Sequence, residues 1–397
     1  MTTDVIMEHF DEEQTHAISR VEAAIAAFQK GEIVLLTDDE DRENEGDLIL
    51  AAEFASAENI NFMAVEARGL ICIAMTGERL DHLAVPMMPS QNQGVFGTAF
   101  TVSIEARYGV TTGISAADRA KTIQVAVDPK STNSDLVTPG HIFPLRARDG
   151  GVLVRTGQTE GSVDLAKLSG LLPGAVLCEI MNPDGTMARR PELEAFSKKH
   201  DIVMLSVADI IAFRLRNESL IDEIQDTPFQ TEFEGQWRVK SFRNQVDGSE
   251  HIAFVCGTPR DDVPTLVRVQ HRWDTFDIFS HQQSPSLETI QGAMKKIGKE
   301  GCGVVLYLDR VESRASDLVN KHVDLVNTKS GVLNVVPSHQ KVDVNLPNET
   351  LRDLGIGSQI LSKIGVGKMK ILTDRPKKII GTEAYGLEVV EQVPIKD

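Results

Sequence analysis

The stretch Glu32–Asp47, EIVLLTDDEDRENEGD, joins a short apolar segment to an acidic run. The run Asp38–Asp47 holds seven carboxylates and one arginine, and Gly46 permits a tight backbone path. Loops that follow buried strands are where α/β domains bind ligands. Crowded carboxylates repel one another unless a cation joins them, and hard oxygen ligands suit Mg²⁺ or Mn²⁺. The run is therefore either a solvated acidic loop or a metal site.

Strand-like and helix-like segments alternate around this stretch. Apolar residues recur at helical spacing over Val21–Gln29, and the hydroxyls of Ser115 and Thr159 are suited to cap the helices that follow. The alternation predicts a layered α/β fold. Besides Glu32–Thr37, the candidate strands are LILAAEF from Leu48, GLICIAM from Gly69, TAFTVSIEA from Thr98, GGVLVR from Gly150 and GAVLCEIM from Gly174.

Length and charge limit the possible partners and the number of domains. A chain of 397 residues exceeds one core, and the polar, acidic stretch after Arg216 predicts a boundary near residue 218, giving domains 1–217 and 218–397. A net charge of −17 repels nucleic acid and anionic membrane surfaces. The four cysteines form no CxxC pair, the first residues are acidic, and no apolar run is long enough to span a membrane, so we expect a cytoplasmic protein.

Three later segments carry further polar groups with possible chemistry. TPGHIFPLRAR places His141 in an expected Pro-Gly turn, where a lone histidine is more often structural than catalytic. GGVLVRTGQTEGSVD is expected to end a strand at Arg155 and enter a helix at Thr159, which suits a phosphate seat if the arginine takes part. CEIMNPDGTMAR puts Glu179 near a strand end, and a carboxylate in an apolar strand is either paired or functional.

Taken together, the segments DDEDRENEGD, GVTTGISAADRA, PGHIFPLRA and DGTMAR resemble 3,4-dihydroxy-2-butanone 4-phosphate synthase over residues 15–215. The resemblance implies a lyase of riboflavin biosynthesis that converts ribulose 5-phosphate, a sugar phosphate, to a four-carbon ketone phosphate and formate. It also implies a homodimer. A divalent cation and groups that exchange protons near neutral pH suit a reaction through an enediolate.

Carried over residue by residue, the resemblance assigns these roles. His141 and Glu179 become the groups essential for proton transfer, and Glu43 becomes a metal ligand. The substrate and its phosphate are then held by Arg42, Glu43, Asp47, Arg155, Thr156, Gly157, Gln158, Thr159 and Glu179.

One position departs from the family. Gln158 stands where the family usually has a second metal ligand, a histidine. An amide oxygen is a hard donor that Mg²⁺ accepts and Zn²⁺ does not favour, so we expect Gln158 to ligate Mg²⁺ or Mn²⁺ with a narrowed metal preference.

Residues from about 235 onward resemble GTP cyclohydrolase II, most clearly over Leu351–Ile379, which predicts a second α/β domain. That family binds zinc through three closely placed cysteines, and the matching stretch RVQHRWDTFDIFSHQQSPSLE contains none. Cys256 and Cys302 cannot replace the triad, and two histidines ten residues apart, His271 and His281, are more often surface residues. We therefore expect a folded domain without zinc or GTP cyclohydrolase activity.

The alternative hypothesis is a binding protein in which both sites have decayed and which only regulates or scaffolds riboflavin enzymes. The first domain argues against it, because its site residues persist beside the single change at Gln158.

Overall fold

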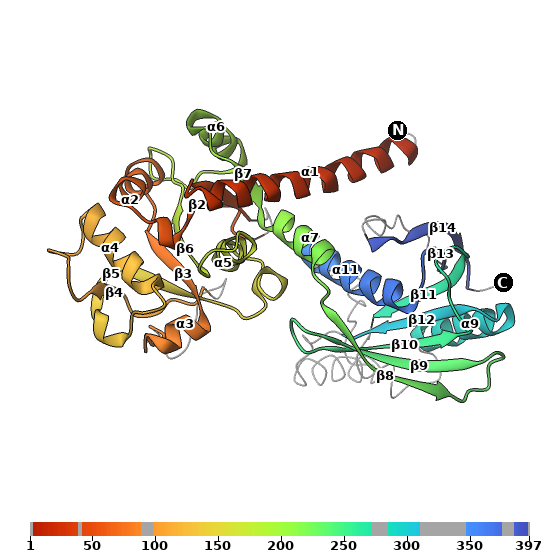
Figure 1. Ribbon diagram of the computed structural model, residues 1–397. Coiled ribbons are helices and arrows are strands. Elements are labelled where there is room, and N and C mark those ends of the chain that lie inside the picture. The colour runs from red at the N-terminus through yellow and green to blue at the C-terminus, as the bar shows by residue number, and fades with distance from the viewer. Residues whose placement is uncertain are drawn as a thin grey trace, which may run out of the picture. The chain divides into compact units, whose positions relative to one another are not determined.

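The computed structural model describes residues 3–38, 42–88, 98–271, 285–309, 347–374 and 385–395. The chain forms two compact units, one of Asp11–Arg214 and one of Leu215–Asp397 together with Met1–Phe10 (Figure 1). The division falls inside helix α7 (Val207–Asn217). The domain ranges 1–217 and 218–397 stay a prediction. Among the described residues, no helix is both long and apolar enough to cross a membrane.

The sheet of the Asp11–Arg214 unit has the strand order β4-β5-β3-β6-β2-β1-β7. Antiparallel pairing of β1 with β2, from Thr37 opposite Gly46, makes the acidic run the loop of a β-hairpin. β2 also pairs with β6, so this hairpin lies inside the sheet. The strands are β1 Val34–Thr37, β2 Gly46–Ala51, β3 Cys72–Thr76, β4 Ile104–Ala106, β5 Leu136–Ala147, β6 Gly174–Glu179 and β7 Met204–Ser206.

Helices cover both faces of this sheet. Successive side chains of β1 point to opposite faces and all of them are buried, so both faces must be covered. Leu35 packs in a core with Ile60 and Ile123. Leu36, the next residue, points to the opposite face and meets α5, where a Cβ built on Gly161 would lie 2.8 Å from it. The α/β layering expected from the sequence is confirmed. The helices are α1 Thr3–Gln29, α2 Ala57–Phe62, α3 Gly77–His82, α4 Ala116–Val127, α5 Gln158–Leu168, α6 Arg190–His200 and α7.

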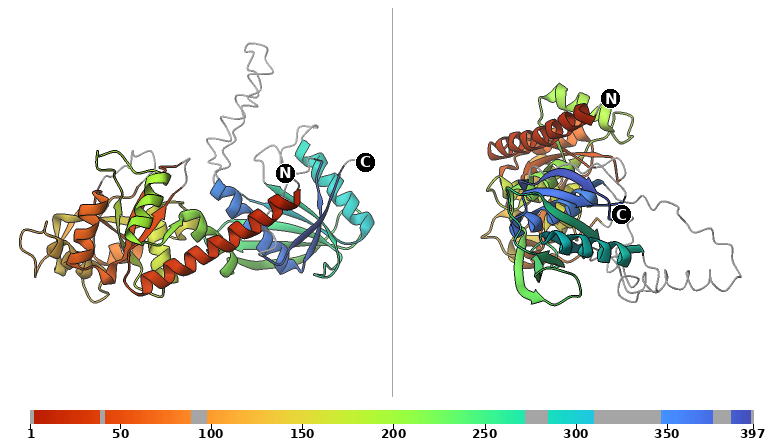
Figure 2. Two further views of the ribbon diagram at one scale, coloured as in Figure 1. Left: turned by 90° about the horizontal axis from the view of Figure 1, so that it is seen from above. Right: turned by 90° about the vertical axis from the view of Figure 1, so that its right-hand side faces the viewer.

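The second unit is built on another sheet with the order β14-β13-β11-β12-β10-β9-β8. Val304 and Leu306 of β12 pack with α11, and Val305 packs with α9 (Figures 1 and 2). Its elements are β8 Ile221–Phe229, β9 Trp237–Asn244, β10 Glu250–Cys256, β11 Thr265–His271, α9 Pro285–Glu300, β12 Gly303–Leu308, α11 Pro347–Ile364, β13 Lys368–Leu372 and β14 Glu388–Val393.

Two sequence expectations about strands and turns are wrong. The expected strand from Gly150 is a short 3₁₀ helix, Gly151–Leu153, because Gly150 and Gly151 have φ angles of 86° and 65° that a strand cannot use. The expected Pro-Gly turn at Thr138–Arg148 is part of β5. Pro139 is tolerated there because pairing with β3 begins only at Phe143 and the register with β4 is irregular.

Three further expectations about element boundaries are also corrected. Thr159 does not cap α5, which begins one residue earlier with Gly157 as its N-cap. Of the expected strand from Thr98, only Ile104–Ala106 forms β4. The polar stretch expected to link the domains contains β8, an edge strand whose exposed face carries charged side chains such as Glu223.

Candidate active site

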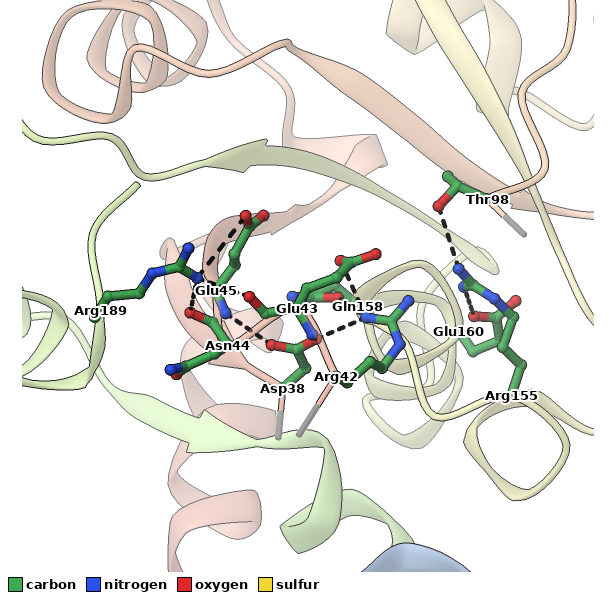
Figure 3. A network of polar contacts seen from close by, with 10 residues as sticks. All are labelled: Asp38, Arg42, Glu43, Asn44, Glu45, Thr98, Arg155, Gln158, Glu160 and Arg189. Carbon is green, nitrogen blue, oxygen red and sulfur yellow. Dashed lines mark hydrogen bonds and ion pairs between the residues drawn. The ribbon is translucent and has the colours of Figure 1, made fainter. Parts of the chain in front are cut away.

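The acidic hairpin loop is organised around the buried carboxylate of Asp38. Asp38 accepts hydrogen bonds from the backbone N–H groups of Glu43 (3.1 Å) and Glu45 (2.8 Å). Its Oδ2 also accepts from Arg42 Nη1 at 2.7 Å. Arg189 donates from outside the loop to the carbonyl oxygen of Glu43 at 2.7 Å (Figure 3). These contacts hold residues 42–45 against Asp38, as a purely solvated acidic loop would not require.

Arg42 connects this loop to the first turn of α5. Its Nη1 donates to Gln158 Oε1 at 2.9 Å and lies 3.1 Å from Glu43 Oε2 (Figure 3). Gln158 is only 5% exposed, and its Nε2 has no acceptor within the described part of the chain. Residues 116 positions apart in the sequence thus share one small polar cluster.

The N-terminus of α5 has the features of an anion seat. No side chain caps its first turn, and a Cβ built on Gly157 would lie 2.5 Å from Arg155 Nη1 and 3.1 Å from Arg42 Nη2. Both guanidinium groups therefore approach the same point. Thr156 is half-buried in the preceding loop and Thr159 is buried in the first turn. The helix dipole and the two arginines together favour a phosphate.

Asp47 and Glu179 are cross-strand neighbours on β2 and β6. Burial raises the pKa of Asp47 well above its ordinary value, and the charge of Glu179 raises it further. The pKa of Glu179 is raised as well, chiefly by burial, although its Oε2 accepts from the N–H of Leu70 at 2.8 Å. Two buried carboxyl groups this close do not readily ionise together, so the pair keeps a proton to a higher pH than isolated carboxyl groups do.

His141 and Glu179 lie toward the same end of the sheet. Leu177, Cys72 and Phe143 are side by side on β6, β3 and β5. Glu179 and His141 each lie two residues further toward one end, with one strand between them. Strands two apart are separated by about 10 Å, a distance that one small substrate can span.

Glu105 and Glu160 are site residues that the sequence reasoning missed. Glu105, buried on β4, places its Oε2 2.6 Å from His141 Nδ1 and accepts from Thr122 at 2.8 Å through Oε1. Glu160 accepts from Arg155 Nη1 at 2.6 Å and fixes that arginine (Figure 3). Like Glu179, Glu105 is an acidic residue within an apolar segment, a sequence signal that points to it as well.

The residues present fit a divalent cation. Oxygens of Asp38, Glu43 and Gln158 already surround one positively charged nitrogen, Arg42 Nη1, at 2.7 to 3.1 Å. Two carboxylates and an amide form a hard donor set of the kind that Mg²⁺ or Mn²⁺ prefers. Among the described residues, no group of three or more His, Cys, Asp or Glu side chains could hold a metal ion. The set of Asp38, Glu43 and Gln158 differs because its third donor is an amide.

Comparison with known proteins matches each of the two units to a known family. The family model of 3,4-dihydroxy-2-butanone 4-phosphate synthase matches residues 22–213, and that of GTP cyclohydrolase II matches residues 222–394. Riboflavin biosynthesis protein RibBA of Aquifex aeolicus is 44% identical over 97% of this chain and 94% of its own length. The 3,4-dihydroxy-2-butanone 4-phosphate synthase of Pseudomonas syringae pv. tomato is 45% identical over 95% of this chain and 99% of its own.

A solved structure that also has two domains matches the chain over most of its length. RibBX, a two-domain 3,4-dihydroxy-2-butanone 4-phosphate synthase from A. baumannii, matches with a TM-score of 0.75 and 36% identity, over 95% of this chain and all of that one.

Proposed function

Because the chain belongs to the 3,4-dihydroxy-2-butanone 4-phosphate synthase family and joins that domain to one of the GTP cyclohydrolase II type, we propose that residues of the Asp11–Arg214 unit form its lyase site. The reaction converts D-ribulose 5-phosphate to L-3,4-dihydroxy-2-butanone 4-phosphate and formate in riboflavin biosynthesis. The observation that supports this site most is the convergence of three segments: Arg42 contacts Gln158, and Asp47 pairs with Glu179.

Substrate binding is assigned to the hairpin loop and the start of α5. Arg155, with the backbone of Thr156–Thr159, would hold the phosphate, and Arg42 would add a second positive charge. Glu43, Asp47 and Glu179 would contact the hydroxyl and carbonyl groups of the sugar. A phosphate bound at a distance from the reacting carbons fixes the register of the substrate without taking part in bond cleavage.

Proton transfer is assigned to His141 and Glu179. With Nδ1 held by Glu105, the imidazole has Nε2 as the atom that can exchange protons with a substrate. Glu179, whose pKa is raised by burial, can donate a proton as well as accept one. Two such groups flanking one strand can act on neighbouring carbons of a ketose.

Glu43 and Gln158 are the proposed ligands of a divalent cation, Mg²⁺ or Mn²⁺. When bound, the cation would stabilise the negative charge that develops on adjacent substrate oxygens. The chain's own contribution is to hold the two donors from separate segments within reach of one position, as their shared contact with Arg42 Nη1 indicates.

Glu43→Ala and His141→Ala test the assignment. Each should lower formate release from ribulose 5-phosphate by at least about a hundredfold, because a lost ligand or proton carrier removes several kcal/mol of transition-state stabilisation. The thermal melts should stay close to the parent's. Glu58→Ala and His82→Ala are matched controls on exposed helical positions and should keep full activity. Near-parental turnover in either site variant, with a normal melt, would show that the site is misassigned.

For the second unit we propose a folded domain that neither opens GTP nor holds zinc. Support comes from the cysteine count: Cys256 and Cys302 are the only cysteines after residue 178, too few for a thiolate triad. The stretch of residues 272–284, where the family's zinc ligands are expected, and His281 lie outside the described residues.

We also propose a homodimer, as the resemblance implies, and a cytoplasmic location. The four cysteines are all free thiols, as in a reducing compartment.

A further inference from the structure

Three oxygens from two segments converge on a single nitrogen of Arg42. Nη1 lies 2.7 Å from Asp38 Oδ2, 2.9 Å from Gln158 Oε1 and 3.1 Å from Glu43 Oε2 (Figure 3). The Asp38 side chain is fully buried, and those of Arg42 and Glu43 are 13% and 20% exposed. We call these three oxygens the oxygen cage. A guanidinium nitrogen and a divalent cation seek the same type of partner, so both cannot occupy the cage at once.

Gln158 supplies an independent sign that the cage faces a ligand. The side chain is 5% exposed, its oxygen accepts from Arg42, and its Nε2 meets no acceptor within the described residues. Buried amides in purely structural positions are nearly always paired at both ends, because a buried donor without an acceptor loses its hydrogen bonds to water and gains none in return. An oxygen of a bound ligand would complete this amide.

The other end of the Arg42 guanidinium already faces the phosphate seat. A Cβ built on Gly157 would lie 3.1 Å from Arg42 Nη2 and 2.5 Å from Arg155 Nη1. Arg42 thus reaches from the oxygen cage to the N-terminus of α5. A small rotation of its side chain, without any shift of the backbone, would move its charge from the cage to an anion beside Arg155.

We propose that Arg42 and a divalent cation compete for the oxygen cage, and that cation binding releases Arg42 toward an anion bound beside Arg155 at the start of α5. The inference rests on the proposed metal site. Arg42 neutralises the buried carboxylates when it occupies the cage, and it adds to the phosphate seat when displaced. Cation and phosphate therefore bind with positive coupling, and this coupling passes through Arg42 and acts equally in both directions.

The first test measures Mn²⁺ binding to the full-length protein by electron paramagnetic resonance, without substrate. Arg42→Gln removes the competitor and should tighten Mn²⁺ binding by about tenfold or more. Arg189→Gln is the matched control, because it removes the same charge beside the same loop from a residue outside the oxygen cage. Arg189 contacts the backbone carbonyls of Glu43 and Asn44 and lies 4.0 Å from Glu45 Oε1. It should tighten binding clearly less. Equal tightening in the two variants would reduce the effect to general charge and overturn the competition.

The second test measures binding of inorganic phosphate by calorimetry, with and without Mg²⁺ at constant ionic strength. In the parent and in Arg189→Gln, Mg²⁺ should strengthen phosphate binding by about fivefold or more, within the usual range of coupling between sites. In Arg42→Gln this gain should disappear. A gain that persists in Arg42→Gln would show direct contact between cation and phosphate and overturn the role of Arg42. If the parent and Arg42→Gln both bind no Mn²⁺, the proposed metal site itself fails.

Discussion

At the scale of single residues, two groups of the proposed site are each held by a neighbouring carboxylate. Glu105 fixes one nitrogen of His141, and Glu160 fixes Arg155. The backbone of Glu179 packs closely against Gly69, where any side chain would clash, because a Cβ built on Gly69 would lie 2.3 Å from the Glu179 carbonyl oxygen. Such supporting groups decide whether a proton carrier or an arginine meets the substrate in a productive orientation.

Replacing Gln158 with histidine restores the ligand usual in the family. We expect Gln158→His to broaden the metal response toward Mn²⁺ and Zn²⁺ more than it raises the rate with Mg²⁺, because imidazole nitrogen is a softer donor than an amide oxygen. Formate release is titrated with each metal for both proteins. Gln158→Ala, which offers no donor, serves as the control and should weaken all three responses. Superimposable curves for the parent and Gln158→His would show that position 158 does not reach the metal.

The buried carboxyl group of Asp47 predicts a pH-dependent stability. Its folded-state pKa is raised above 3.8, chiefly by burial, so its favourable contribution is complete below that pH and is lost as pH rises through the raised value. With a chelator present, Asp47→Asn should therefore gain in melting temperature over the parent between pH 4 and pH 8. Each kcal/mol of the gain corresponds to about 2–4 °C for a domain of this size.

Asp81 provides the opposite control for this measurement. Arg146 donates to its two oxygens at 2.6 and 2.8 Å, and these hydrogen bonds lower the pKa of Asp81. Asp81→Asn should therefore lose melting temperature relative to the parent as pH rises, if it changes at all. A gain for Asp47→Asn that does not grow with pH would contradict a raised pKa at that position.

At the scale of elements, the sequence predicted the strands whose apolar runs are uniform and missed the structure of segments shaped by tertiary contacts. Val34–Thr37 and Gly174–Glu179 are buried strands, as expected. Pro139 was read as part of a turn, since nothing local shows that β5 continues past it. The helix starting at Gln158 lacks a capping side chain, so the cap preference of Thr159 misled the prediction.

The candidate site was less predictable than the fold, for a related reason. Long motifs assigned His141, Glu179 and the acidic loop, but the partners that orient them come from other strands and helices. Glu105 belongs to β4 and contacts His141 across a gap of 36 residues. Such contacts depend on register, which no local pattern in one sequence specifies.

The N-cap of α5 offers a test at this scale. Gly157 has φ −118° and ψ 162°, angles that alanine adopts freely, so Gly157→Ala should keep the fold and lower the thermal melt only slightly, because alanine is a weaker N-cap than glycine. The added methyl group would displace Arg155 Nη1, 2.5 Å from the built Cβ. We expect KM for ribulose 5-phosphate to rise about tenfold or more, with kcat changed less, because the phosphate anchor is affected and the proton carriers are not. A lowered kcat at unchanged KM would mean that the phosphate binds elsewhere.

At the scale of the whole molecule, the proposal that the second domain does not open GTP can be tested directly. Opening the imidazole ring of GTP needs a strongly polarised water, and a chain with two cysteines in this domain lacks the thiolate triad that would hold the zinc. We expect elemental analysis of the full-length protein to find no stoichiometric zinc, and GTP to yield neither formate nor pyrophosphate. One equivalent of zinc together with GTP turnover would refute this expectation.

Removal of the second domain should nevertheless alter the lyase. Gln359 of α11 donates to the carbonyl oxygens of Leu215 and Glu218, at 2.7 and 2.9 Å, and the buried Leu215 packs at Gly355. A protein of residues 1–217 loses these partners and exposes Leu215 at its new end, so we expect lower solubility or a changed oligomer, with formate release altered as a consequence. Full-length Gln359→Ala is the control, because it removes the hydrogen bonds and keeps the domain, and its activity should stay close to the parent's. Light scattering and the formate assay decide the matter: a truncated protein with unchanged oligomeric state, solubility and rate would show that the second domain contributes nothing to the synthase.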